Sequence, residues 1–162
     1  MIILGIDPGS TRIGFGAIEK QNSKLKYLKS GLVQTTPEQK KQNYHLLLIS
    51  KAISSLIKEL QPERIGLEKL FFSKNQKTAL EVAQARGVIV QTITKMSIPL
   101  LEFSPPEVKL AVTGDGRASK TGVARMVQII LGLSLDKEPD DVTDALAIAI
   151  TASNQRIHNF NK

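Results

Sequence analysis

The stretch IILGID, residues 2–7, is the part of the chain that decides its fold. Its first five residues are apolar or glycine, which is the pattern of a short strand buried on both faces of a sheet. The run Asp7-Pro8-Gly9-Ser10 overlaps its end and is a turn signal. We therefore expect a central strand that ends in a carboxylate, where a loop begins.

Two more strands are predicted directly after this turn. Residues 13–17 carry apolar side chains at every second position, and a third strand is expected from residue 25 to about residue 35. Strands that follow one another with only short turns between them most simply form an antiparallel meander.

Helices and strands then alternate. A stripe of leucine and isoleucine between residues 46 and 60 has helical spacing, and Pro62 ends it. We expect a strand over 64–68, a helix from about 76 to 96 and a strand over 98–103.

Three helices are expected in the last third of the chain. Ser104-Pro105-Pro106-Glu107 reads as a capping box with proline at the start of a helix that runs to about Val112. Ser119 is expected to cap the next helix, and Pro139 begins the last. The element order predicts an α/β fold with a five-stranded mixed sheet and helices on both faces, in one domain over 1–155 with a polar tail over 156–162.

The composition favours a polyanionic partner. The chain has 162 residues, with 22 Lys and Arg against 15 Asp and Glu, a net charge of +7. Such a balance attracts nucleic acids, although a basic charge that only aids solubility is the alternative.

Several other classes have no support in the sequence. The absence of cysteine excludes disulfides and thiolate zinc sites. Only His45 and His158 are present, so a serine–histidine triad has little basis. No apolar run reaches the ~18–20 residues that cross a bilayer, and strand-like sequence begins at once, which leaves no room for a signal peptide. We expect a cytoplasmic protein.

Four acids lie at the ends of the expected elements. Asp7 and Glu68 each end an apolar strand, and Asp141 and Asp144 are one helical turn apart where the last helix begins. Taken singly, each has an ordinary interpretation: a turn cap, a solvated carboxylate, or partners of the helix dipole.

Together the four acids predict metal chemistry. If the fourth strand pairs beside the first, and the last helix starts at the same sheet edge, the four carboxylates converge. Their repulsion would call for a hard divalent cation with oxygen ligands, such as Mg²⁺. Two such ions ~3.5–4 Å apart can clamp the attacking and leaving oxygens of a phosphodiester, so the pattern predicts a nuclease.

These residues also carry a family resemblance. The chain resembles the RuvC family of Holliday junction resolvases, which have a ribonuclease-H-like fold. The matching segments occur in family order over about residues 2–151: LGIDPGS (4–10), Glu68 with Phe71 and Lys74-Asn75, QARG (84–87) and DVTDALAIA (141–149).

The resemblance implies specific roles. Asp7, Glu68, Asp141 and Asp144 would be the catalytic acids, binding two Mg²⁺ per subunit with Mn²⁺ as a substitute. Some relatives carry histidine at one of the last two positions, whereas this chain keeps aspartate at both. Asp140 is an extra acid, and Asp140 with Asp144 is also a pair on one helix face.

Basic residues around two loops are candidates for DNA binding. The segment after Glu68 carries Lys69, Lys74 and Lys77 with no acid among them, and Phe71 and Phe72 lie within it. A basic loop with an exposed aromatic side chain binds phosphates and stacks on distorted bases. By the resemblance, Phe71 matches an aromatic wedge near the junction centre, and Phe72 is expected to pack in the core.

A second basic group surrounds the glycine-rich turn at 114–116, and consists of Lys109, Arg117, Lys120 and Arg125. By the resemblance, Lys109 and Lys120 match basic residues near the scissile phosphate. Lys120 is expected to stabilise charge in the transition state. Arg86 is expected either to contact phosphate or to support the site internally.

The resemblance also implies partners: a four-way DNA junction, a second copy of the chain in a homodimer, and the RuvA and RuvB branch-migration proteins. The small residues Ala79, Ala83 and Gly87 lie along one side of the helix expected to pack against its mate. Alternative interpretations are a RuvC-like nuclease of structured RNA, a non-catalytic junction-binding protein, and an actin-like or sugar-kinase ATPase. The ATPase class requires a second phosphate motif and a longer chain.

Overall fold

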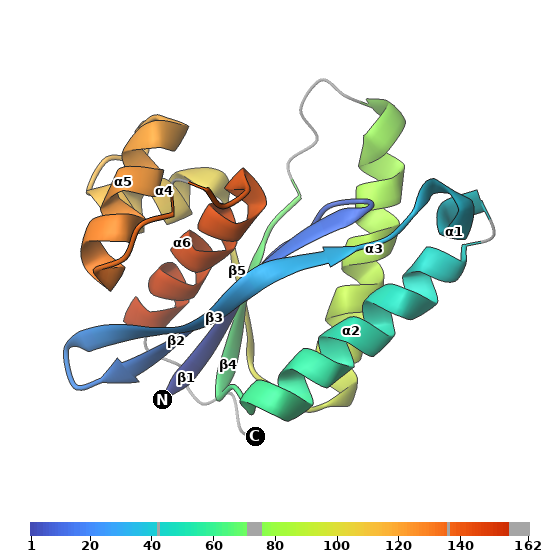
Figure 1. Ribbon diagram of the computed structural model, residues 1–162, viewed down its shortest axis with the longest axis horizontal. Coiled ribbons are helices and arrows are strands. Elements are labelled where there is room, and N and C mark those ends of the chain that lie inside the picture. Colours follow the sequence, from blue (N-terminus) through green and yellow to red (C-terminus); the bar gives the residue numbers. More distant parts are fainter. Residues whose placement is uncertain (42, 71–75, 136, 156–162) are drawn as a thin grey trace.

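The computed structural model describes residues 1–41, 43–70, 76–135 and 137–155, and contains a five-stranded sheet flanked by helices (Figure 1). The strands are β1 (Ile2–Asp7), β2 (Arg12–Gln21), β3 (Lys24–Gln34), β4 (Arg64–Glu68) and β5 (Leu100–Phe103). Their order in the sheet is β3-β2-β1-β4-β5, so β1 is central as the sequence predicts. The first three strands form the expected antiparallel meander, and β4 and β5 are added in parallel to β1.

The helices are α1 (Pro37–Lys41), α2 (Tyr44–Leu60), α3 (Gln76–Lys95), α4 (Pro105–Thr113), α5 (Lys120–Leu131) and α6 (Asp140–Asn154). One face of the sheet is covered by α2 and α3, and the other by α6 with α4 and α5 outside it (Figure 1). The predicted mixed sheet with helices on both faces is therefore confirmed. None of the helices that the structure describes is long and apolar enough to cross a membrane.

Two details differ from the sequence prediction. The fifth strand begins at Leu100 rather than at Ile98, because the Ile98 amide donates to the Ile93 carbonyl and closes the end of α3. The short helix α1 was not predicted, because five residues rich in lysine and glutamine carry no apolar period.

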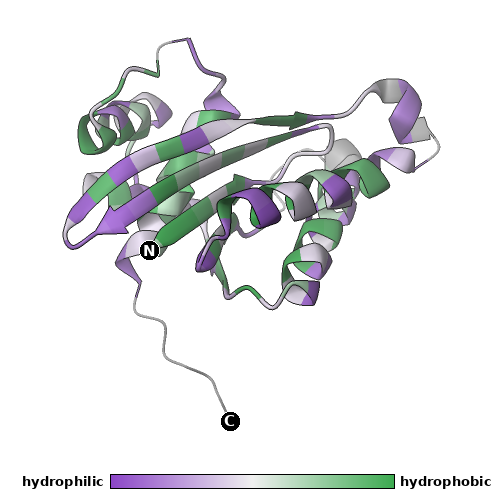
Figure 2. Cartoon of the chain, turned by 60° about the horizontal axis from the view of Figure 1, so that its bottom comes forward, coloured by the Kyte–Doolittle hydropathy of each residue, from purple (hydrophilic) through white to green (hydrophobic). Residues whose placement is uncertain are grey.

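Side chains alternate between the two faces of each strand, and this alternation decides which of them point toward α6. In β1, Leu4 and Ile6 pack against the α2 and α3 side, so Ile3, Gly5 and Asp7 point the other way. Figure 2 shows β1, which starts at the N label, as an almost wholly hydrophobic strand. The last residue of the strand therefore places a carboxylate on the α6 face, beyond a buried apolar run.

Glycines on that face let α6 lie against the strand backbone. A Cβ on Gly5 would lie 2.0 Å from the Ala145 carbonyl oxygen, and one on Gly14 would lie 2.0 Å from the Asp141 carbonyl oxygen. A Cβ on Gly16 would lie 2.7 Å from the Leu146 side chain, and one on Gly66 would lie 2.8 Å from that of Ile148. This contact fixes where α6 begins relative to the ends of β1 and β4.

We predict that Gly5→Ala destabilises the protein by about 3 kcal/mol or more, because backbone atoms of α6 would have to move away. Chemical denaturation measures this loss. Gly87→Ala is the matched control: a Cβ there meets nothing within 4 Å, and alanine favours a helix by about 0.5–1 kcal/mol. Equal stability of the two variants would contradict the close contact.

Candidate active site

The four acids predicted from the sequence converge at one edge of the sheet. Since β1 and β4 are parallel and Ile6 pairs with Leu67, the next residues, Asp7 and Glu68, end their strands side by side. Both point to the α6 face by the two-residue period. The first turn of α6 then brings Asp141 and Asp144 over the same edge, because α6 lies on the strand glycines.

The charges of these acids act on one another. Burial, followed by the charges of Glu68, Asp144 and Asp141, raises the pKa of Asp7 from 3.8 to about 8. Asp7 therefore holds a proton at neutral pH and donates it to the Glu68 carboxylate. Burial also raises the pKa of Glu68 and of Asp144, although hydrogen bonds from Asp7 and Lys120 oppose these two shifts.

Two cationic side chains hold the acids of α6. The Arg12 Nη2 atom lies 2.6 Å from Asp141 Oδ2, and Lys120 Nζ lies 3.1 Å from Asp144 Oδ2. Arg12 was not among the residues predicted from the sequence. Its place at the start of the strand that pairs beside Asp7 is the signal that could have identified it.

The extra acid of the motif faces outward. The Asp140 side chain is 78% exposed and pairs with Lys120 at 3.2 Å, but it is not among the groups that shift the pKa of Asp7. Of the two same-face pairs that the sequence allows, Asp141 with Asp144 is therefore the one that faces Asp7.

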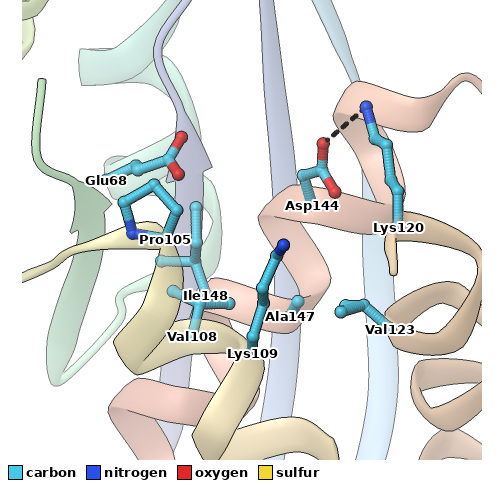
Figure 3. A pocket seen from close by; sticks show the side chains of 9 residues that line it. All are labelled: Glu68, Pro105, Val108, Lys109, Lys120, Val123, Asp144, Ala147 and Ile148. Atoms are coloured by element: carbon cyan, nitrogen blue, oxygen red, sulfur yellow. Dashed lines mark ion pairs between the residues drawn. The ribbon is translucent and has the colours of Figure 1, made fainter. Parts of the chain in front are cut away.

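A cavity of about 220 Å³ adjoins the acids (Figure 3). It has an acidic and basic rim over an apolar floor, and is lined by Glu68, Asp144, Lys109, Lys120, Pro105, Val108, Val123, Ala147 and Ile148. In Figure 3 the Lys109 side chain extends from α4 toward the space between Glu68 and Asp144. Two cations and two acids thus share a concave site that is open to solvent.

Helix caps position the two lysines of the cavity. The predicted capping box is present at α4, where Ser104 accepts from the Glu107 amide and Glu107 accepts from the Ser104 amide. Ser119 caps α5 by accepting from the Gly122 amide, which makes Lys120 the first residue of that helix. Both predictions are confirmed.

Arg86 lies behind the site. Its Nε donates to the Glu68 carbonyl oxygen at 3.4 Å, and its guanidinium pairs with Glu102 of β5. These contacts favour internal support over phosphate contact, the two roles that the sequence left open.

The other basic candidates are only partly described. Lys69 pairs with Glu107 at 3.9 Å, and Arg117 and Arg125 are exposed on the α4–α5 side. The candidates Phe71 and Lys74, together with Phe72, lie outside the described residues, and for Lys77 only the helical backbone is described.

The residues present fit a hard divalent cation. The four acids offer only oxygen donors, and their mutual repulsion is relieved by positive charge. Within the part of the chain that the structure describes, no three acidic or histidine side chains are arranged to hold one metal ion together. Arg12 and Lys120 supply the compensating charge instead.

The comparisons with known proteins agree on one family. Residues 3–152 match the family model described as "Crossover junction endodeoxyribonuclease RuvC". The protein of that name from Moorella thermoacetica is 47% identical over 150 residues, which cover 93% of this chain and 89% of the relative. The one from Brachyspira hyodysenteriae is 44% identical over 98% of both chains.

A solved structure matches over nearly the whole chain as well. Thermus thermophilus RuvC in complex with a Holliday junction substrate superposes with a TM-score of 0.87 at 32% identity, covering 94% of this chain and 93% of that one. The ribonuclease-H-like fold expected from the sequence is thereby confirmed.

We predict that Asp7→Asn stabilises the protein in the absence of divalent cations. The folded pKa of Asp7 is raised, so its contribution to stability is complete at low pH and is lost as the pH rises through about 8. Asparagine carries no charge at any pH. In denaturation with a chelator we expect a gain of about 1–3 kcal/mol at pH 8.5 and a smaller gain at pH 5.

The surface substitution Glu59→Gln, which breaks an exposed pair with Lys29, is the control and should change stability by about 0.5 kcal/mol or less at both pH values. A less stable Asp7→Asn at pH 8.5 would show that Asp7 is not crowded by the other acids.

Proposed function

The chain belongs to the family of the crossover junction endodeoxyribonuclease RuvC, and from this membership we propose that it resolves four-way (Holliday) DNA junctions in recombination and repair. It would do so by paired symmetric nicks. The observation that carries the proposal is the convergence of Asp7 with Glu68, Asp141 and Asp144, beside two lysines. We assign the activity to one nuclease domain over residues 1–155.

The family acts as a metal-dependent nuclease, and we propose Mg²⁺, two ions per subunit, with Mn²⁺ as a substitute. Asp7, Glu68, Asp141 and Asp144 would hold them, which their all-oxygen donor set supports. Bound ions of this kind lower the pKa of a water that attacks phosphorus and stabilise the leaving 3′ oxygen.

The chain's own groups prepare the site in three ways. When the proton that Asp7 shares with Glu68 is lost to solvent, all four acids would be available as anionic donors. The apolar floor formed by Pro105, Val108 and Ile148 excludes water beneath the reacting phosphate. The lysines on the rim place positive charge beside the acids, where negative charge would develop on the phosphate.

Lys120 is the residue that we assign to charge stabilisation in the transition state. Its pKa is affected first by burial, which lowers it, but the bonds and charges of Asp144 and Asp140 outweigh this effect and raise it. The group therefore remains a cation at every working pH. Lys109 faces the same cavity and would hold the scissile strand from the other side.

We propose that the junction is held by basic and aromatic residues around this cavity. Lys69, Lys74, Lys77 and Arg117 would contact phosphates, and Phe71 would act as the wedge at the junction centre. Arg86 was proposed as a DNA contact as well, but its bonds to Glu68 and Glu102 support a bracing role.

A homodimer would present two such sites to the two strands that must be cut. The exposed face of α3 supports this proposal: the Leu80 side chain is 68% exposed, and a Cβ on Gly87 would meet nothing within 4 Å. We further propose that RuvA and RuvB are functional partners, by family membership, and that the protein acts in the cytoplasm.

We predict that Asp7→Asn keeps junction binding and loses cleavage in Mg²⁺ by about a hundredfold or more, because one anionic donor is removed from the site. Gel-shift binding in Ca²⁺ and nick mapping in Mg²⁺ on a mobile four-way junction measure the two properties. The control variant Glu59→Gln alters an exposed acid that pairs with Lys29, outside the site, and should lower cleavage by only about twofold or less. Equal cleavage by Asp7→Asn and the unmodified protein would refute the assignment.

We predict that Phe71→Ala weakens resolution more than binding, because stacking in the opened junction is worth about 1–3 kcal/mol per base. Phe71→Trp keeps a stacking surface and should retain most of the cleavage. Gel shifts with a junction and with a linear duplex measure binding, and nick yields measure resolution. A junction and a duplex that bind equally well would refute structure selectivity, and faster cleavage of structured RNA would favour the RNA nuclease alternative.

A further inference from the structure

Arg12 is a charged residue of the site to which the mechanism above gives no role. It opens β2, the strand beside Asp7, and its guanidinium holds one oxygen of Asp141 at 2.6 Å. Asp141 is one of the four acids assigned to metal binding. Arg12 therefore occupies, in the metal-free protein, a carboxylate oxygen that a cation would otherwise use.

This ion pair is easily exchanged. The Arg12 side chain is 51% exposed and that of Asp141 is 32% exposed, so water screens their attraction. Exposed pairs contribute about 0.2–1 kcal/mol, whereas separating a buried pair costs several times more. A divalent cation held by several carboxylates can displace a partner that binds so weakly.

The state of the other acids agrees with such an exchange. Among the described residues no three acids are arranged to hold one metal ion together. The two acids of α6 are instead paired with cations, Asp141 with Arg12 and Asp144 with Lys120. Lys120 acts on Asp144 as Arg12 acts on Asp141. Arg12 and Lys120 thus offset part of the negative charge of the cluster.

We propose that Arg12 is an exchangeable counter-ion: it pairs with Asp141 in the metal-free protein, leaves this acid when a divalent cation binds, and then binds a phosphate of the DNA strand. The inference rests on the proposed function of the site. A released guanidinium at the rim has the planar donor geometry that suits phosphate oxygens. Arg12 would thereby couple metal binding to DNA binding.

The test compares Arg12→Gln with the unmodified full-length protein in two equilibrium measurements. Mn²⁺ affinity is measured without DNA from the electron paramagnetic resonance signal of free Mn²⁺. Junction affinity is measured in Ca²⁺ and in a chelator by fluorescence anisotropy. Arg12→Lys keeps the charge, and Lys29→Gln removes a charge from a remote exposed pair with Glu59 at 2.6 Å, so these variants serve as controls.

We expect Arg12→Gln to bind Mn²⁺ about twofold to fivefold more tightly, since no ion pair has to be broken. We also expect the gain in junction affinity on adding Ca²⁺ to be at least about threefold smaller than in the unmodified protein, since the released phosphate contact is missing. Lys29→Gln should leave both quantities unchanged. Arg12→Lys keeps the charge but not the planar donor geometry, so its values should lie between those of Arg12→Gln and the unmodified protein.

Unchanged or weaker Mn²⁺ binding by Arg12→Gln would overturn the inference, because Arg12 would then be a permanent support that orients Asp141. Tighter Mn²⁺ binding with the full Ca²⁺ gain would also overturn it, because no contact passes to DNA. Cleavage of the junction by the unmodified protein in Mg²⁺ is measured alongside. If that cleavage is absent, the proposed function fails; if it is present, a negative result in the two affinity measurements concerns Arg12 alone.

Discussion

The contact of α6 with the sheet is the constraint on which the rest of the structure depends. At Gly5 and Gly14 the α6 face of β1 and β2 carries no side chain, and carbonyl oxygens of α6 occupy the space that a Cβ would need. The helix is buried along most of its length, between the sheet and the helices α4 and α5. Because α6 packs directly on the strand backbone, its first turn lies over the end of β1 that carries Asp7. Asp141 and Asp144 are thereby brought close to Asp7.

Bringing the acids together has an energetic cost that the fold offsets locally. Burial and the neighbouring carboxylates raise the pKa of Asp7 to about 8, so a proton remains on it. Arg12 and Lys120 neutralise the two acids of α6. These three compensations are a proton and two partly exposed ion pairs, which suits the proposed binding of cations and a phosphate.

The parts of the site differ in how firmly they are held. The strand ends and α6 are fixed by the core and by close backbone packing. Lys120 begins α5 and Lys109 lies in the middle of α4, and caps by Ser119 and Ser104 fix the starts of these two helices. The carboxylates are therefore attached to a firmly packed frame, while the side chains of Arg12 and Lys120 are more than half exposed.

The sequence by itself determined the order of the strands and of every helix except α1, the central place of IILGID and the two helix caps, and it singled out the four acids, because each of these rests on local spacing or a local hydrogen bond. It also carried the family motifs. Only the tertiary structure decided the partner of Asp141, the outward position of Asp140, the bracing contacts of Arg86 and the start of β5 at Leu100. These depend on contacts between residues far apart in the chain, such as Arg12 with Asp141, which no local pattern encodes.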